Sequence, residues 1–429
     1  MEIDSYFIYN SLLGPKEGEE IKKLLFYFPK EQKLFRKIND VGLCEAIVQF
    51  SNTFLSHGHC KYMQTNDRIY LFHEPEPSFW IVLSMRKPSG NEFGGIKDEA
   101  LLSTYQFILE ESYERFCLWH NTFAALLEAF GTAILISKCK FFFEEFLEQF
   151  GRTPKLEKNL FGGFQYFSQD KSSILNFRSL LSRVQETFPE VLSVTFFHNG
   201  QLILTDLSDG PCSVLSKAFH SQLNPTNSSR SKFNKKKVVR KLKYGSIYVH
   251  LKSVHFPALF GECQVCIYCV SNFTIIFLIS CGIEADDYFS KIDMVVGAQL
   301  TSLVSSVLSI TESKKSLPEL NLKFLYSNKL NKSLVASNCG NLNDVAIETL
   351  TIPNDVLQKM YVMHEFILNH RKHDYEIMEK VQADCWLSLK VLHGKELYVV
   401  IHHKNANLIC VNDDIKKLSF QFDNISFAD

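Results

Sequence analysis

The uncharged stretch CQVCIYCVSNFTIIFLISCGI, residues 263–283, restricts the fold class of this chain more than any other segment. It is long enough to cross a bilayer as a single helix. However, the polar pair Ser271-Asn272 falls near its middle, and the residues on both sides are rich in β-branched and aromatic side chains. Two apolar strands joined at a polar dipeptide account for this composition better than a membrane helix does. The stretch therefore predicts a β-hairpin, with a membrane span as the alternative.

The composition of the whole chain is that of a folded protein with balanced charge. It has 429 residues, 46% hydrophobic and 22% charged, and 46 Lys+Arg stand against 47 Asp+Glu. These values exclude a fully disordered or collagen-like chain, and the lack of a basic excess argues against a nucleic-acid binder. Twelve cysteines are too few for a disulfide-stapled scaffold, and the start Met1-Glu2-Ile3-Asp4 lacks the pattern of a signal peptide. We expect about three domains of roughly 150 residues each, in the reducing cytoplasm.

Strand and helix patterns follow one another in an order that recurs along the chain. Val191–Phe197 and Gln201–Leu207, for example, flank His198-Asn199-Gly200, whose Asn-Gly pair is typical of a tight hairpin turn. Apolar residues at three-to-four spacing over 33–54 predict an amphipathic helix. The order strand, strand, helix, three strands, helix is found three times. It predicts an α+β fold of three domains, each an antiparallel five-stranded sheet flanked by helices.

Two polar segments mark the expected domain boundaries. Residues 151–163 and 312–320 (ESKKSLPEL) have the composition of linkers, and an irregular stretch covers 224–244. The expected domains are 1–150, 164–312 with the loop 224–244 inside it, and 320–429. The further expected helices cover 98–150, 209–223, 286–310, 353–369 and 407–420.

Sequence motifs of covalent catalysis and cofactor binding are missing from the chain. It contains no Gly-x4-Gly-Lys-Ser/Thr phosphate loop, no Gly-x-Gly-x-x-Gly, no Gly-x-Ser-x-Gly and no His-Glu-x-x-His. Cys263, Cys266 and Cys269 are spaced like half of a zinc site, but positions three apart point to opposite faces of a strand, so buried thiols are the preferred interpretation. His364-Glu365 with His370 has the wrong spacing for two ligands on one helix turn. We therefore expect no enzyme, no cofactor and no metal site.

A basic segment stands out in the second expected domain. No acidic residue occurs between Gly210 and Gly261. The segment could be a solvated loop or a nuclear-import signal, but it could also bind an anionic membrane leaflet, at about 1 kcal/mol per basic residue. We take docking to a phosphoinositide membrane as the hypothesis to test. Its candidate residues are Arg230, Lys232, Lys235, Lys236, Lys237, Arg240, Lys241 and Lys243.

Several short stretches resemble one protein family from end to end. In the first expected domain these are YFIYN (6–10), GPKEG (14–18) and VGLCEAIVQF (41–50), and in the third KNANLI (404–409). They are similar to the Ccz family, whose members are subunits of the Mon–Ccz vacuolar and endosomal fusion complex. The stretch around 211–260 departs most from the family pattern.

The resemblance implies a fold, a set of partners and an activity. The fold is three longin-type domains, in agreement with the repeated order of elements. The partners are a Mon-family longin subunit, with which the chain would act as exchange factor for a late-endosomal Rab GTPase, and a third, scaffold-like subunit in metazoan complexes. Exchange in this family proceeds by remodelling of the first switch loop and loss of GDP. The protein would be cytoplasmic and recruited peripherally to late endosomes and lysosomes.

Longin-type pairs associate through the helix after the second strand, which places the partner and Rab contacts on the helix over 33–54. Gly42 in its middle would permit close approach, at roughly 1 kcal/mol of helix stability relative to Ala. Part of this helix must also cover its own sheet. The candidate partner-binding residues are Val41, Gly42, Leu43, Glu45, Ala46 and Gln49, with Gly14, Pro15 and Glu17 as weaker loop candidates. The alternatives are a longin-type tether without exchange activity and an enzyme with scattered site residues.

Overall fold

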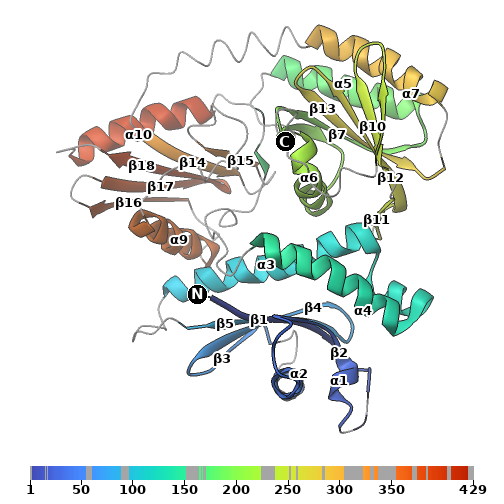
Figure 1. Cartoon of the computed structure of the whole chain (residues 1–429). Helices are drawn as coiled ribbons and strands as arrows, with labels where there is room; N and C mark the ends of the chain where they lie inside the picture. Colours follow the sequence, from blue (N-terminus) through green and yellow to red (C-terminus); the bar gives the residue numbers. More distant parts are fainter. Residues whose placement is uncertain are drawn as a thin grey trace. The chain divides into compact units, whose positions relative to one another are not determined.

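The structure is a computed structural model of the whole chain, and it divides into two compact units, Met1–Asn159 and Leu160–Asp429 (Figure 1). Their boundary falls in the predicted linker 151–163, whereas the predicted separation of the second and third domains stays a prediction. The residues that the structure describes are 2–14, 16, 18–54, 60–87, 96–150, 164–165, 167, 171–223, 237–250, 253–257, 259–282, 286–303, 322–328, 333–336, 354–369, 374–382, 385–402 and 407–423.

The first unit is built on an antiparallel sheet of five strands, as predicted. The strands are β1 (Glu2–Asn10), β2 (Leu24–Phe28), β3 (Tyr62–Gln64), β4 (Arg68–Glu76) and β5 (Phe79–Arg86), in the order β2-β1-β5-β4-β3. A short helix, α1 (Glu20–Lys23), precedes β2. The longest register joins the central strands β1 and β5, from Glu2 opposite Arg86 to Asn10 opposite Phe79.

Helices cover both faces of this sheet. The helix α2 (Leu34–Asn52) lies on one face, and α3 (Ile96–His120) and α4 (Phe123–Phe150) lie on the other (Figure 1). Side chains alternate along a strand, so Phe7 and Tyr9 of β1 pack beneath α2, while Tyr6 and Ile8 pack beneath α3 and α4. The sheet is thus buried on both sides, and two separate cores form.

The second sheet contains seven strands in the described residues, two more than predicted. They are β7 (Val191–His198), β8 (Gln201–Thr205), β9 (Lys237–Lys241), β10 (Ser246–His250), β11 (Val254–Phe256), β12 (Gly261–Val270) and β13 (Phe273–Ser280). The extra strands are β9 and β11. The charged sequence of β9 predicts a loop. Its backbone nevertheless pairs antiparallel with β10, a pairing that the sequence alone does not reveal.

The stretch 263–283 forms the predicted hairpin. β12 and β13 pair antiparallel from Cys263 opposite Ser280 to Val270 opposite Phe273, and Ser271 in the turn has a φ of 52°. Within the described ranges no single helix is long and apolar enough to cross a bilayer. Only Ile108–His120 and Phe123–Glu148 together meet the length and composition criteria, across a bend of 69°.

The helices around the second sheet differ in two places from the expected order. The helix α6 (Asp209–Leu223) begins and ends as predicted, but α5 (Lys171–Thr187) was not expected. The predicted helix 286–310 begins as α7 (Asp286–Ile292) and passes into a π-helical turn, η3 (Asp293–Gly297); helical residues continue to 303, and 304–310 lie outside the described residues.

The third sheet has six described strands rather than five. Five follow the predicted order: β14 (Leu322–Asn328), β15 (Ser333–Ala336), β16 (Tyr375–Gln382), β17 (Cys385–Leu392) and β18 (Lys395–His402). The sixth, β6 (Phe164–Gln165), pairs parallel with β15. A strand of two residues so far away in sequence leaves no recognisable pattern, which is why the sequence did not predict it. The helices are α9 (Asn354–Asn369) and α10 (Leu408–Asp423).

Candidate partner-binding face of the first domain

The helix α2 has one buried side and one exposed side. Val41, Cys44 and Val48 face the sheet and are at most 5% exposed. On the opposite side, large apolar residues point away from the sheet: Phe35 is 75%, Leu43 43% and Phe50 66% exposed. We call this side the outer face of α2; it consists of Phe35, Asn39, Gly42, Leu43, Ala46, Gln49 and Phe50. These positions recur every three or four residues, so they form one continuous strip along the helix.

The structure separates the six helix residues predicted to bind partners. Gly42, Leu43, Ala46 and Gln49 lie on the outer face, where a partner could reach them. Val41 is 0% exposed and packs against the sheet, so it supports the helix from within. Glu45 lies at the flank of the helix, and both of its carboxylate oxygens accept hydrogen bonds from Lys23 Nζ at 2.7 Å.

Gly42 leaves an open place in the middle of the outer face. A Cβ atom built at this position would meet no other atom within 4 Å. Nothing inside the described part of the chain therefore requires a glycine here, although glycine costs an exposed helix about 1 kcal/mol relative to alanine. A close approach by another molecule is one physical reason for it.

The loop residues predicted as weaker candidates have a structural explanation where they are described. Gly14 has a φ of 63°, and a Cβ on it would lie 2.6 Å from the carbonyl oxygen of Glu19. The turn between β1 and α1 therefore requires glycine at this position. Pro15 and Glu17 lie outside the described residues.

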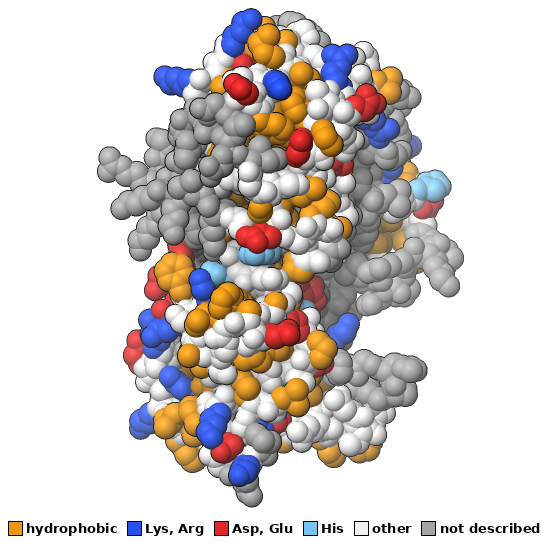
Figure 2. Space-filling view, turned by 90° about the vertical axis from the view of Figure 1, so that its right-hand side faces the viewer, with side chains coloured by type: hydrophobic (Ala, Val, Ile, Leu, Met, Phe, Trp, Pro, Cys, Tyr) orange, Lys and Arg blue, Asp and Glu red, His pale blue; other side chains and the backbone are white. Residues whose placement is uncertain are grey.

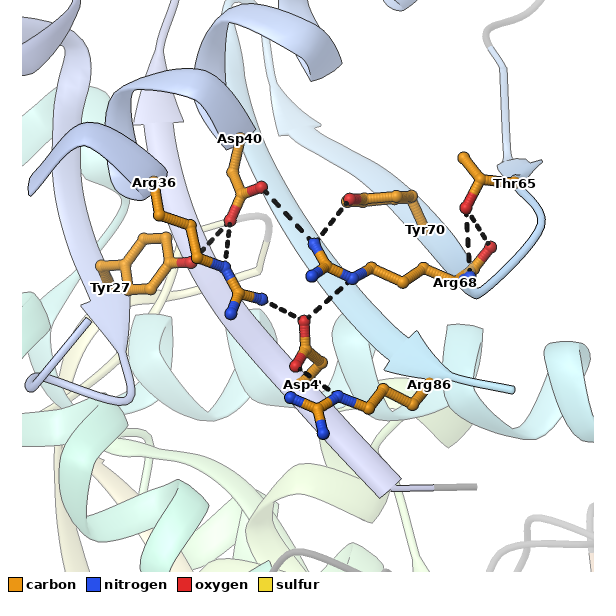
Figure 3. Close-up of polar contacts among 8 residues, drawn as sticks. All are labelled: Asp4, Tyr27, Arg36, Asp40, Thr65, Arg68, Tyr70 and Arg86. Atoms are coloured by element: carbon orange, nitrogen blue, oxygen red, sulfur yellow. Dashed lines mark hydrogen bonds and ion pairs between the residues drawn. The ribbon is translucent and has the colours of Figure 1, made fainter. Parts of the chain in front are cut away.

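An ion-pair network, absent from the sequence predictions, fixes the N-terminal half of α2 on the sheet (Figure 3). Asp4 of β1 is 7% exposed and interacts with three arginines. Its carboxylate accepts from Arg86 Nε at 2.9 Å, pairs with Arg68 Nε at 3.3 Å and accepts a hydrogen bond from Arg36 of α2. One buried carboxylate thereby connects α2 to β1, β4 and β5.

Asp40 of α2 is the second buried carboxylate of this network. It is 5% exposed and accepts a hydrogen bond from Tyr27 Oη at 2.6 Å. Arg36 Nε and Arg68 Nη1 lie 3.6 and 4.0 Å from its oxygens. Burial, and then the neighbouring Asp40, raise the pKa of Tyr27, so its hydroxyl remains a proton donor at physiological pH. Two features of the sequence could have indicated this network. Asp4 lies inside a strand, and Asp40 lies on the sheet-facing side of a helix.

The basic segment of the second domain is only partly within the described residues. Arg230, Lys232, Lys235 and Lys236 lie outside them. Lys237, Arg240 and Lys241 belong to β9, an edge strand of the sheet, so the predicted loop is a strand over this part. Lys241 and Lys243 are exposed.

A buried carboxylate holds the turn that follows β9. Asp293 of η3 is 2% exposed and accepts hydrogen bonds from the backbone N–H groups of Tyr244 and Gly245 at 3.0 and 3.1 Å.

On the face shown in the space-filling view, lysine and arginine side chains are interspersed with acidic and hydrophobic ones (Figure 2).

The remaining titratable candidates have internal partners. His364 Nδ1 of α9 lies 3.0 Å from Glu396 Oε2 and 3.0 Å from Tyr398 Oη, two buried residues of β18. Cys263 and Cys266 are buried in β12, as expected for structural thiols. Among the described side chains, no group of three or more His, Cys, Asp or Glu is arranged so that it could hold a metal ion.

Comparisons with known proteins agree with this architecture. Residues 3–121 match the family described as the first longin domain of INTU, CCZ1 and HPS4, and residues 319–418 match Intu longin-like domain 3. The chain is 31% identical to the vacuolar fusion protein CCZ1 homolog of Danio rerio, over 99% of this chain and 95% of that protein. It is 31% identical to the homolog of Xenopus tropicalis and 22% identical to that of Dictyostelium discoideum, in each case over 99% of this chain and 97% of the relative. The chain therefore belongs to the family of CCZ1 homologs and has the longin-type α+β fold that its sequence predicted.

Proposed function

We propose that this chain is a non-covalent subunit of a heterodimeric guanine-nucleotide exchange factor that acts on a late-endosomal Rab GTPase. Its relatives are named vacuolar fusion proteins, and the proposal assigns the same fusion role to this chain. The exposed outer face of α2, with Gly42 in its centre, is the observation that carries it. The partner is a Mon-family longin subunit, and a third, scaffold-like subunit remains a prediction.

The proposed mechanism requires binding and no bond chemistry. An exchange factor binds the nucleotide-free GTPase more tightly than the loaded one, and by reciprocity it weakens nucleotide binding by the same factor. Displacement of the first switch loop would remove contacts to magnesium and phosphate, and GDP would leave faster. The chain needs only a rigid surface that holds the switch loop in its displaced conformation.

The outer face of α2 has the properties of a surface that pairs with the partner subunit, next to which the switch loop would be held. Phe50 and Phe54, 66% and 72% exposed, contact each other edge to face with ring centroids 4.8 Å apart. Exposed apolar patches mark sites of protein interaction, and aromatic residues are enriched in protein interfaces. The network of Asp4 and Asp40 makes the helix rigid, so little conformational entropy would be lost on binding.

A nucleotide-release assay tests the proposal. A late-endosomal Rab loaded with fluorescent GDP is mixed with this chain, with a Mon-family subunit, or with both. We expect accelerated release only when both subunits are present. Release with this chain alone, or none with the assembled pair, would contradict the proposal. A stable pair that binds the Rab without releasing nucleotide would favour the alternative function, a tether or scaffold on endosomal membranes.

The membrane part of the proposal rests on the basic segment 230–243. Its lysines and arginines would attract the anionic leaflet of late endosomes and lysosomes and recruit the complex peripherally. The combined change Lys235→Glu, Lys236→Glu and Lys237→Glu is expected to reduce flotation with phosphoinositide liposomes severalfold. The same three-charge reversal at Lys138, Lys140 and Lys416, three exposed lysines outside the segment, is the matched control. Equal flotation of the first variant and the wild type would remove the membrane role.

A further inference from the structure

The charges around α2 are distributed unevenly along the helix. Lys33, Arg36 and Lys37 lie at its N-terminal end, while residues 38–54 contain no lysine or arginine. No acidic residue stands in the first turn of α2. The helix thus begins with a basic turn, and the outer face that follows it carries no charged side chain.

Strand residues enlarge the basic end. Arg68 and Arg86 lie beside Arg36 in the ion-pair network, where three guanidinium groups share the two carboxylates of Asp4 and Asp40 (Figure 3). The network therefore keeps an excess positive charge. The Arg86 side chain is 61% exposed although its Nε binds Asp4, so part of its guanidinium group faces solvent. We call Lys33, Arg36, Lys37, Arg68 and Arg86 the basic end of α2. Its exposed members are Lys33 and Arg86, whereas Lys37 Nζ donates a hydrogen bond to the backbone carbonyl of Lys30 at 2.8 Å.

We propose that the basic end of α2 binds carboxylates of the partner subunit and thereby fixes the direction in which the partner lies along α2. The inference rests on the proposed function, since it assigns the chemistry of the partner at the same face. The occupant is an amphipathic helix of the partner: its acidic end meets Lys33 and Arg86, and its apolar part covers Leu43, Ala46 and Phe50.

Two features favour a protein carboxylate over an anionic lipid. The buried Asp4 holds the guanidinium group of Arg86 through Nε, and the two terminal nitrogens of this half-exposed fork match a carboxylate in two parallel hydrogen bonds. The apolar residues that follow are spaced along a single line of one helix, as in helix-to-helix docking. Without the basic end, an apolar helix could lie on the outer face in either direction, so the charges provide orientation.

Charge reversal at Lys33 tests the inference. Lys33 is exposed, it is the N-cap residue of α2, and its side chain makes no capping hydrogen bond. An acidic residue there should leave the melting temperature of the full chain unchanged or raise it, because negative charge is favourable at a helix N-terminus. Association of Lys33→Glu with the purified Mon-family subunit should nevertheless be slowed about tenfold in low salt, with a smaller loss at high salt. A second variant, Arg86→Gln, should weaken association in the same direction.

The matched control is Lys138→Glu, an equal charge change at an exposed position of α4. It should associate as the wild type does. If Lys33→Glu and Arg86→Gln also associate normally while Gly42→Trp does not, the orientation inference is wrong and the pairing face stands. If Gly42→Trp pairs normally as well, the proposed face is itself wrong. If the basic-end variants lose binding to phosphoinositide vesicles and keep partner binding, this end contacts membrane, and the inference is likewise overturned.

Discussion

The two helical layers of the first domain cover the same sheet in different ways. On one face, α3 and α4 bury a large aromatic core in which Phe116, Phe123 and Phe143 are all 0% exposed. On the other face α2 is alone, and its fully or nearly buried apolar residues are Val41, Cys44 and Val48. The Asp4–Asp40 ion-pair network supplies additional contacts there. A helix held by few apolar residues and a network at one end keeps most of its outer side available for a partner.

Exposed apolar residues alone do not distinguish the two layers. α4 also exposes Phe130 at 60% and Phe141 at 67%. α4 also carries a glycine, Gly131, but its φ of 77° places it at a kink of that helix, whereas Gly42 lies within the regular helix α2 and has no such conformational requirement. The basic N-terminal end is a further feature of α2. The comparison therefore predicts that equal changes on the two helices have unequal effects.

The largest expected effect comes from a tryptophan at a small residue on each helix. Gly42→Trp places a bulky ring in the centre of the outer face of α2, and it should weaken association with the Mon-family subunit more than a hundredfold, equivalent to about 3 kcal/mol. The monomer should remain folded because no atom lies near a Cβ at this position. Titration calorimetry with the purified partner gives the affinity, and circular dichroism checks the fold.

Ala133→Trp on α4 is the matched control, since Ala133 is exposed and is followed by Ile134, which is 42% exposed. It should leave the affinity for the partner within about a factor of two, a difference below 0.5 kcal/mol. The opposite pattern, in which the α4 variant loses the partner and the α2 variant keeps it, would assign pairing to the other layer.

The sequence predicted α2 but could not sort its residues by role. Periodic apolar residues gave the helix to within two residues at each end, and the family-like stretch 41–50 supplied the candidates. That stretch covers nearly three helical turns, so it necessarily includes inner, flanking and outer positions. Val41 and Glu45 were thus grouped with Gly42 and Ala46 although they point in other directions. The helical period itself, applied within the stretch, would have separated them.

The parts of the fold that were not predicted depend on contacts distant in sequence. β6 becomes a strand only because β15 is next to it, and β9 only because β10 offers a partner. The ion-pair network similarly joins positions 4, 36, 40, 68 and 86, and no local pattern connects them. The hairpin 263–283, in contrast, was predicted correctly because its partners are adjacent in sequence.

Removal of the Asp4 carboxylate should measure how much the ion-pair network contributes to the free energy of unfolding. Asp4→Asn leaves Arg36, Arg68 and Arg86 without their shared anion, and the free energy of unfolding should fall by about 2–3 kcal/mol, because breaking a largely buried pair leaves charge uncompensated. Urea unfolding of the full chain, followed by fluorescence, provides the measurement. Asp67→Asn, the same change at an exposed aspartate, should alter stability by less than about 0.5 kcal/mol. Equal stabilities for all three proteins would mean that apolar packing alone holds α2.

The smallest expected effect concerns a histidine on the α3–α4 side. His73 of β4 lies beside Tyr113 of α3, with ring centroids 6.4 Å apart, and burial lowers its pKa to about 4. Between pH 6.5 and 4 the unfolded chain binds a proton at this position and the folded chain does not. Stability is therefore lost as the pH falls through this range. His73→Gln should remove about 1–2 kcal/mol of that loss, after allowance for the part of the ring that solvent reaches.

The measurement compares urea unfolding of His73→Gln and wild type at pH 7 and at pH 4.5. His198 of β7 has a pKa lowered by burial in the same way, so the wild type retains a second acid-sensitive group and the variant should flatten the pH dependence without abolishing it. His402→Gln, at an exposed position of β18, should leave the pH dependence unchanged. The effects of Asp4→Asn and His73→Gln on the free energy of unfolding should add, since the two residues belong to opposite faces of the sheet and share no partner.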